Sequence, residues 1–212
     1  GGDNVVLVDL GANTTTVVLR VRGHGVFATS LPRGSASFAA ALAKTAGLSA
    51  EEAERRCRTT NLLVGENADP AVAQAVETWA GELRLAVNEW LEDHAVLGLH
   101  SASLPAYLCG GGAAQPGLLA RVNNFAGFRL QWWPVAGGPR AQAEGLAFVV
   151  AEGAALHAFG HVRHRVSLLP AEYRAGVHRQ FAWEIVQACV VLLLLGLAAV
   201  LGVGIWRQAA LL

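Results

Sequence analysis

The sequence contains no methionine and only three cysteines among its 212 residues. Cys57, Cys109 and Cys189 lie far apart and have no metal-ligand spacing, so we expect neither a cysteine metal site nor a disulfide framework. Basic and acidic residues balance at 16 each, which argues against nucleic-acid binding. No Ser/His/Asp or Cys/His arrangement indicates nucleophilic catalysis.

Charge is also absent from one long stretch near the C-terminus. Ile185–Trp206 has 22 residues without a charged side chain. As a helix it would be about 33 Å long, enough for a hydrocarbon core of about 30 Å. A buried core helix is the alternative, but such helices are usually shorter and amphipathic. The stretch therefore predicts a transmembrane helix. Because the chain lacks methionine and ends soon after this stretch, we expect it to be a segment of a longer protein.

Arginines on the two sides of this stretch predict its orientation. The four that precede it are Arg163, Arg165, Arg174 and Arg179, whereas only Arg207 follows it. Positive residues favour the cytoplasmic side. We therefore expect a single-pass protein of the bacterial inner membrane with its N-terminal domain in the cytoplasm.

The remaining residues alternate between strand and helix patterns. The predicted strands are Val5–Leu10, Thr15–Val21, Val26–Leu31, Leu104–Cys109 and Phe128–Trp132, with a turn at Gly23–Gly25 between the second and the third. The predicted helices are Ser35–Ala46, a short helix with a Ser49/Glu52 capping box up to about Thr59, Asp69–His94, Pro116–Phe125 and Ala141–His157. Three meandering strands followed by alternating helices and strands predict an α/β fold with a mixed sheet.

Two glycine turns are candidates for binding a phosphorylated ligand. The first contains Asp9, Gly11, Ala12, Asn13 and Thr14, between two predicted strands. Glycine allows close backbone approach to a phosphate, and an aspartate at a strand end can hold a metal ion or its waters. The second contains Gly110, Gly111 and Gly112, after a buried strand, where a base or ribose could lie against the backbone. Each turn alone is more often a simple chain reversal.

Five stretches in order resemble the second half of the actin-like ATPases, most closely the PilM family of type IV pilus assembly proteins. They are LVDLGANTTTVVL, FATSLPRGSASFAAALAKTAGLSAEEAE, ELRLAVNEWLED, YLCGGGAAQPGLL and AEGLAFVVAEGAAL. The resemblance implies a ribonuclease H-like subdomain that binds ATP through both glycine turns, with Mg²⁺ held by Asp9 through water. It also implies that Glu82 faces the nucleotide base. No stretch matches the phosphate-1 hairpin of the family's first half, so we do not expect this segment alone to hydrolyse ATP.

The stretch before the predicted membrane helix has a resemblance of its own. Arg165–Tyr173 is similar to the cytoplasmic start of PilN proteins, whose Asn-Leu-Leu-Pro stretch docks onto PilM; here it reads Ser167, Leu168, Leu169, Pro170. An actin-like domain followed by one span also resembles the layout of the type II secretion protein GspL. The alternative is a basic linker punctuated by proline.

These patterns predict three regions: an actin-like domain at 1–160, a juxtamembrane connector at 161–184 and a membrane helix at 185–206. The predicted function is an inner-membrane assembly-platform scaffold of a type IV pilus or type II secretion system. Its expected partners are other platform proteins and a cytoplasmic assembly ATPase, in a homo- or hetero-oligomer. The alternatives are an ATPase or sugar-kinase-type enzyme with a cleft completed by a missing N-terminal half, and an actin-class cell-division protein.

Overall fold

The computed structural model describes residues 4–123, 125–127, 129–135, 144–160, 186–187 and 190–191. The chain divides into two units, Gly1–His161 and Val162–Leu212, and every strand and helix discussed below belongs to the first. The predicted docking residues Ser167–Pro170 lie outside the described residues, as does all of the predicted span except four helical positions. Among the described residues, no helix combines the length and the apolar character that crossing a bilayer requires. The membrane helix therefore stays a prediction.

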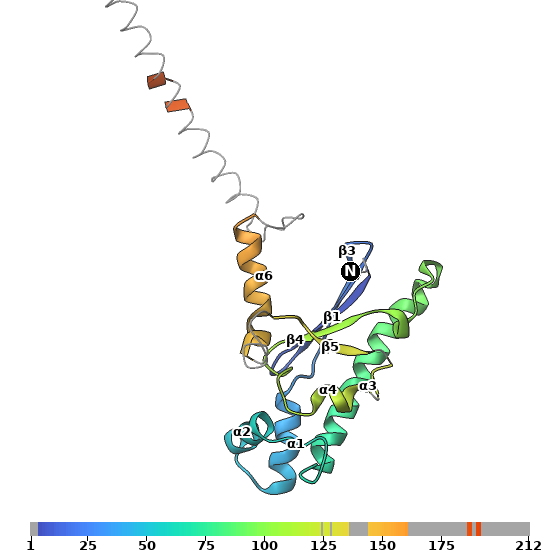
Figure 1. The fold of residues 1–212 in the computed structure, drawn as a ribbon, viewed down its shortest axis with the longest axis vertical. Coiled ribbons are helices and arrows are strands. Elements are labelled where there is room, and N and C mark those ends of the chain that lie inside the picture. Colours follow the sequence, from blue (N-terminus) through green and yellow to red (C-terminus); the bar gives the residue numbers. More distant parts are fainter. Residues whose placement is uncertain are drawn as a thin grey trace, which may run out of the picture. The chain divides into compact units, whose positions relative to one another are not determined.

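Five strands form one mixed sheet in the order β3-β2-β1-β4-β5 (Figure 1). The strands are β1 (Val5–Leu10), β2 (Thr15–Val21), β3 (His24–Leu31), β4 (Ala106–Cys109) and β5 (Leu130–Trp132). The first three form an antiparallel meander, while β4 runs parallel to β1 and β5 runs parallel to β4. The predicted α/β fold with a mixed sheet is confirmed.

The turn between β2 and β3 is tighter and begins one residue earlier than its glycines predict. Arg22 and Gly23 form the turn with φ of 52° and 83°, and Val21 pairs directly with His24. Positive φ at both central residues gives a turn whose twist matches that of the flanking strands. β3 therefore begins at His24 instead of Val26.

Two of the predicted helix starts are seen in their capping contacts. The helices are α1 (Ala36–Ala46), α2 (Ala50–Thr59), α3 (Pro70–Asp93), α4 (Leu118–Val122) and α6 (Val149–Ala158). Asp69 accepts hydrogen bonds from the amides of Ala71 and Val72 at 2.9 and 3.0 Å, which fixes the start of α3. Ser49 likewise accepts from the amide of Glu52 at 3.2 Å. The Glu52 carboxylate binds Arg55 and Arg56 instead of reaching back, so only half of the predicted capping box forms.

Two of the predicted elements are shorter than expected, and a third is interrupted. α4 starts at Leu118 because Gly117 has a φ of 79°, and it ends before Asn123, whose side chain binds the backbone of Leu130. Of the predicted helix Ala141–His157, Glu144 and Gly145 are helical, a 3-10 turn follows over Leu146–Phe148, and α6 continues from Val149, while residues 141–143 lie outside the described part of the chain. β4 starts at Ala106 because the preceding residue is Pro105, which has no amide to donate.

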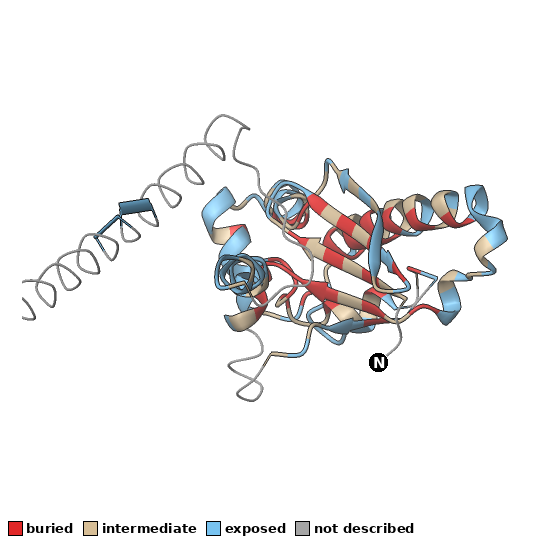
Figure 2. Ribbon diagram, turned by 90° about the horizontal axis from the view of Figure 1, so that it is seen from above, coloured by how far each residue is buried: buried red, intermediate tan, exposed pale blue. Residues whose placement is uncertain are grey.

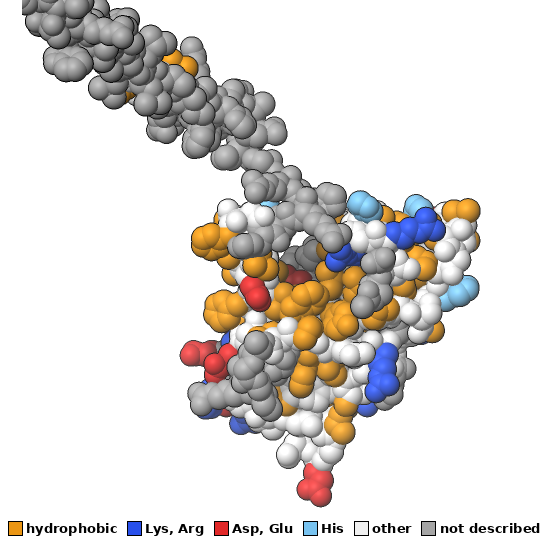
Figure 3. Space-filling model, turned by 45° about the horizontal axis from the view of Figure 1, so that its top comes forward, with side chains coloured by type: hydrophobic (Ala, Val, Ile, Leu, Met, Phe, Trp, Pro, Cys, Tyr) orange, Lys and Arg blue, Asp and Glu red, His pale blue; other side chains and the backbone are white. Residues whose placement is uncertain are grey.

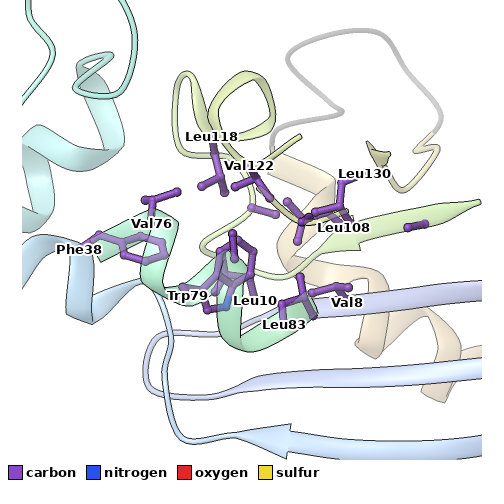
Figure 4. Packing of buried hydrophobic residues seen from close by; sticks show 14 of the residues in the cluster. Val8, Leu10, Phe38, Val76, Trp79, Leu83, Leu108, Leu118, Val122 and Leu130 are labelled. Atoms are coloured by element: carbon purple, nitrogen blue, oxygen red, sulfur yellow. The ribbon is translucent and has the colours of Figure 1, made fainter. Parts of the chain in front are cut away.

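The core lies between one face of the sheet and the helices α1, α3 and α4. Alternate residues of β1 and β2 are buried, as are positions at three- and four-residue intervals along α3 (Figure 2). Trp79 of α3 lies at the centre, with Leu10, Leu83 and Phe38 around it (Figure 4). The rings of Phe38 and Trp79 meet edge to face at 6.0 Å. This packing fixes α1 and α3 against the strands from which the glycine turns emerge.

The helices α1, α3 and α4 each bury residues in the core, whereas none of the residues of α6 is buried. Apolar side chains at and around it remain open, including Phe148 at 67% and Phe159 at 79% exposure. Figure 3 shows hydrophobic side chains gathered across the middle of one face of the molecule, with charged side chains spread around them. Exposed apolar surface of this kind is typical of a surface that contacts a partner.

Candidate functional site

The two predicted glycine turns meet at one edge of the sheet. β1 and β4 are parallel neighbours, so the turns that follow them emerge side by side at their carboxyl ends. The amide of Gly112 donates to the carbonyl of Leu10 at 2.9 Å and joins the two turns directly. The amide of Gly110 donates to the carbonyl of Leu146 at 2.9 Å, which holds the second turn against the segment before α6.

Backbone hydrogen bonds hold the first turn in place, and the residues at its tip are exposed. The amide of Gly11 donates to the carbonyl of Thr14 at 3.0 Å, while the carbonyls of Gly11 and Ala12 accept from the amides of Ser35 and Ala36 at 3.0 and 2.8 Å. Ala12, Asn13 and Thr14 are exposed, and within the described part of the chain no backbone carbonyl accepts from their amides. Consecutive free amides in a turn form a concave site for an anion.

The glycines of the second turn occupy three different environments. A Cβ on Gly110, whose φ is 96°, would lie 2.4 Å from Asp9 Oδ1 and 2.5 Å from the carbonyl oxygen of Leu10. A Cβ on Gly112 would lie 2.7 Å from the Cβ of Ser35. A Cβ on Gly111 would meet no atom within 4 Å. Gly110 and Gly112 are therefore required by packing, whereas Gly111 faces open space.

A cavity of about 300 Å³ lies between the two turns and the helices α1 and α2. Of the predicted site residues, Ala12, Gly111 and Gly112 line it. Sequence reasoning missed its polar lining, which consists of Ser35, Glu54, Arg58, Gln115 and Glu144. Glu54 belongs to the charged run Glu51–Arg56 of α2, and only the packing of α2 beside the turns places it at the cavity.

Gln115 is the buried polar residue of this lining. Its side chain is 6% exposed, and its Nε2 has no hydrogen-bond partner among the described residues. Buried polar groups are nearly always paired in folded proteins. A glutamine placed between Ala114 and Pro116 in a mostly apolar stretch was the one sequence feature that could have drawn attention to it.

Asp9 lies at the end of β1, directly opposite Cys109 in the register of the sheet. Burial raises the pKa of Asp9 above its ordinary value. Burial, with the charge of Asp9 as a smaller cause, raises the pKa of the Cys109 thiol to about 11. The thiol is therefore protonated at neutral pH and is a poor nucleophile. The role of Asp9 as a water-mediated metal ligand stays a prediction.

Glu82 is placed apart from the cavity. The Arg33 guanidinium binds both of its carboxylate oxygens, with Nε–Oε distances of 3.0 and 2.9 Å. The Arg33 carbonyl accepts from Thr15 Oγ1 at 2.7 Å, and Trp79 Nε1 donates to the same hydroxyl at 2.9 Å. These contacts fix the 33–36 segment that supports the first turn. The assignment of Glu82 to the nucleotide base stays a prediction, and the lining of the cavity does not support it.

The class of fold follows from the strand order. The sheet has an antiparallel meander followed by two parallel strands, and a glycine turn follows the first strand and the fourth. The chain has the ribonuclease H-like α/β fold of the actin-like ATPases.

Solved structures with this fold include the following three. The PilM–PilN type IV pilus biogenesis complex matches with a TM-score of 0.53 and 25% identity, over 72% of this chain and 45% of that one. MreB5 of Spiroplasma citri bound to AMPPNP matches with a TM-score of 0.54 and 14% identity, over 73% of this chain and 52% of that one. The ethanolamine utilization protein EutJ from Carboxydothermus hydrogenoformans matches with a TM-score of 0.51 and 22% identity, over 68% of this chain and 49% of that one. The chain thus spans about half the length of these proteins. No protein-family model and no curated protein matches it.

Proposed function

We propose that this chain is the nucleotide-binding, actin-like part of an inner-membrane assembly platform for a type IV pilus or a type II secretion system. The observation that carries the proposal is the cavity between two hydrogen-bonded glycine turns, on a fold shared with the PilM–PilN complex and with MreB5 bound to AMPPNP. The platform would couple cytoplasmic nucleotide binding to partners across the membrane.

The residues present fit an adenine nucleotide with Mg²⁺. A cavity of about 300 Å³ lies at the lower end of the range for ligand sites and suits a nucleoside. The free amides of the first turn would hold phosphate oxygens. Mg²⁺ commonly binds through one or two carboxylates, waters and substrate phosphates, and Asp9 could supply one such carboxylate through water. The described residues contain no group of three metal-ligating side chains, so the phosphates would have to complete the coordination.

A scaffold is favoured over an enzyme by two observations. The PilM–PilN structure is a complex of two pilus biogenesis proteins and shares 25% of its aligned residues with this chain. The exposed apolar residues of α6 also favour a chain that binds other proteins. ATP hydrolysis, the rival function on this fold, would appear as phosphate release by the whole protein.

The proposal is tested at Gly111, which lines the cavity and where an added Cβ would meet no atom within 4 Å. Gly111→Leu should fill the cavity, leave the protein folded and lower the affinity for ATP and ADP at least tenfold in titration calorimetry. The matched control is Gly81→Leu, because Gly81 lies on α3, away from this cavity, and also has open space for a side chain. Nucleotide binding that is absent from the wild type, or unchanged in Gly111→Leu, would reject this site.

Membrane orientation is a separate part of the proposal. The arginine imbalance predicts that residues 1–180 lie in the cytoplasm and that Arg207 onward lies in the periplasm. Alkaline phosphatase fused after Leu212 should be active, because its disulfides form only in an oxidising compartment. A well-expressed but inactive fusion would overturn the orientation.

Docking of the connector is a further part. Leu168 and Leu169 form an apolar pair in a charged stretch, and the proline that follows Leu169 favours an extended backbone there. We expect Ser167–Pro170 to pack against an actin-like domain of this chain or of a neighbour. Changing both leucines to aspartate should then speed proteolysis at Arg165 and Arg174. Equal cleavage rates in the wild type and the double mutant would leave the stretch as a linker.

A further inference from the structure

The hydroxyl of Thr15 is buried at a position where packing alone would accept a valine. Val17, two residues further along β2, is fully buried on the same face of the strand, as Thr15 is. The Thr15 hydroxyl accepts a hydrogen bond from Trp79 Nε1 at 2.9 Å and donates one to the carbonyl of Arg33 at 2.7 Å. Burying a hydroxyl is unfavourable unless it is hydrogen-bonded, and a valine could satisfy neither partner. These two contacts are therefore what the hydroxyl adds to the core.

The carbonyl that this hydroxyl holds begins the segment 33–36, which lies against the first glycine turn. The carbonyl of Gly11 accepts from the amide of Ser35 at 3.0 Å. The next carbonyl, that of Ala12, accepts from the amide of Ala36 at 2.8 Å. Two consecutive carbonyls of the turn are thus held by one segment, and the Thr15 hydroxyl holds the start of that segment.

The direction of these carbonyls decides where the amides of the turn point. In a planar trans peptide, the carbonyl and the N–H lie on opposite sides of the chain. Because the Gly11 carbonyl faces the segment 33–36, the amide of Ala12 faces away from it, and the Ala12 carbonyl directs the amide of Asn13 away in the same manner. Ala12 and Asn13 are exposed, so both amides are open to one phosphate group.

We propose that Thr15 is a positioning residue for phosphate binding. Through the Arg33 carbonyl its hydroxyl keeps the segment 33–36 in place, and the segment keeps the amides of Ala12 and Asn13 directed at the phosphates. Thr15 itself does not touch the ligand. The inference rests on the proposed nucleotide function and extends it, because the affinity for a nucleotide then has a phosphate part that depends on Thr15 and a nucleoside part that does not.

The experiment compares ADP with adenosine, which lacks the phosphates, under conditions in which circular dichroism shows each variant to be folded. Thr15→Val keeps the shape and removes the hydroxyl, so the affinity for ADP in titration calorimetry should fall about tenfold. The affinity for adenosine, measured by its displacement of ADP, should not change. Thr15→Ser keeps the hydroxyl and should bind ADP within about threefold of the wild type. Thr16→Val is the matched control, because Thr16 points to the other face of β2.

Three results would each overturn the inference and leave nucleotide binding intact. In the first, Thr15→Val binds ADP as tightly as the wild type does. In the second, it loses the same affinity for ADP and for adenosine, which would be a change of the whole cavity. In the third, Thr15→Ser binds ADP as weakly as Thr15→Val does, so that the hydroxyl is not the group that matters.

Two further outcomes are separate from these. If Thr15→Val does not fold, Trp79→Phe carries the same test, because it removes the N–H that is donated to the hydroxyl. This variant should bind ADP about threefold more weakly and adenosine unchanged, and equal changes for both ligands would again overturn the inference. If the wild type binds neither ADP nor adenosine, the proposed function fails and this inference fails with it.

Discussion

The two glycine turns lie side by side on parallel strands, yet they use glycine differently. In the first, Gly11 closes the turn on Thr14, and the tip of the turn remains open for a ligand. In the second, Gly110 and Gly112 leave no space for a side chain, whereas Gly111 does. A run of three glycines therefore does not mean that a ligand approaches three glycines. Two of them allow the turns to touch, and one keeps the cavity open.

The largest effect should come from adding one methyl group to the second turn. Gly110→Ala combines a φ of 96° with a Cβ 2.5 Å from the Leu10 carbonyl oxygen, and the backbone there cannot move cheaply. We expect a loss of about 3 kcal/mol in the free energy of unfolding. Gly111→Ala, one residue along, should change it by less than about 0.5 kcal/mol. Urea denaturation of both variants checks the contrast, and equal losses would remove the distinction between packed and open glycines.

The first turn depends on a buried hydroxyl. Thr15 is fully buried and bonds both Trp79 Nε1 and the carbonyl of Arg33. Thr15→Val preserves the shape but leaves both partners unpaired, which should cost about 2 kcal/mol. Thr16→Val is the control, because Thr16 points to the other face of the same strand. Thermal unfolding measures both, and a Thr15→Val protein as stable as the control would show that the segment behind the first turn needs no such anchor.

Much of the fold follows from local sequence. The strand patterns of β1 and β2 and the Asp69-Pro70 start of α3 have physical causes that are visible in the sequence, namely alternation and capping. The position of the turn between β2 and β3 does not follow from local sequence. Arg22 adopts a positive φ that its residue type disfavours, and only the pairing of Val21 with His24 requires it. The length of α4 depends on a contact between Asn123 and Leu130 that the sequence does not announce.

The candidate site could be predicted where it is backbone and not where it is side chain. Glycine turns after strands are local features, and both were located correctly in the chain. Glu54 and Arg58 reach the cavity only because α2 packs beside the turns, which is a tertiary event. Glu82 is the opposite case, because the sequence assigns it to the site but the cavity lining does not include it. It instead pairs with Arg33, which follows β3.

The Arg33–Glu82 pair ties the segment behind the first turn to α3. It is bidentate, but both side chains are over a third exposed, so we expect only about 1 kcal/mol of coupling from a double-mutant cycle of Arg33→Leu and Glu82→Gln. Nucleotide affinity should change little in Glu82→Gln. If this variant keeps its stability but loses ten times or more in ADP affinity, Glu82 faces the base as the family resemblance implies, and the purely structural role fails.

The smallest effect should be a pH dependence at Asp9, where the two turns touch. Burial raises the pKa of this carboxyl above its ordinary 3.8, so the folded protein holds the proton more tightly than the unfolded chain. As pH rises from 3.8 through the raised folded pKa, the unfolded state loses its proton first, and stability falls across that window; above it the deficit is constant. Asp9→Asn removes the titrating group, so its stability relative to the wild type should increase over the same window and then level off. The increase should be small, because the carboxyl is only half-buried.

Thermal unfolding of both proteins across acid to neutral pH measures this difference in stability. A difference that does not vary with pH would mean that Asp9 is as well solvated in the folded protein as in the unfolded chain, and that the second turn does not press on the first at this point.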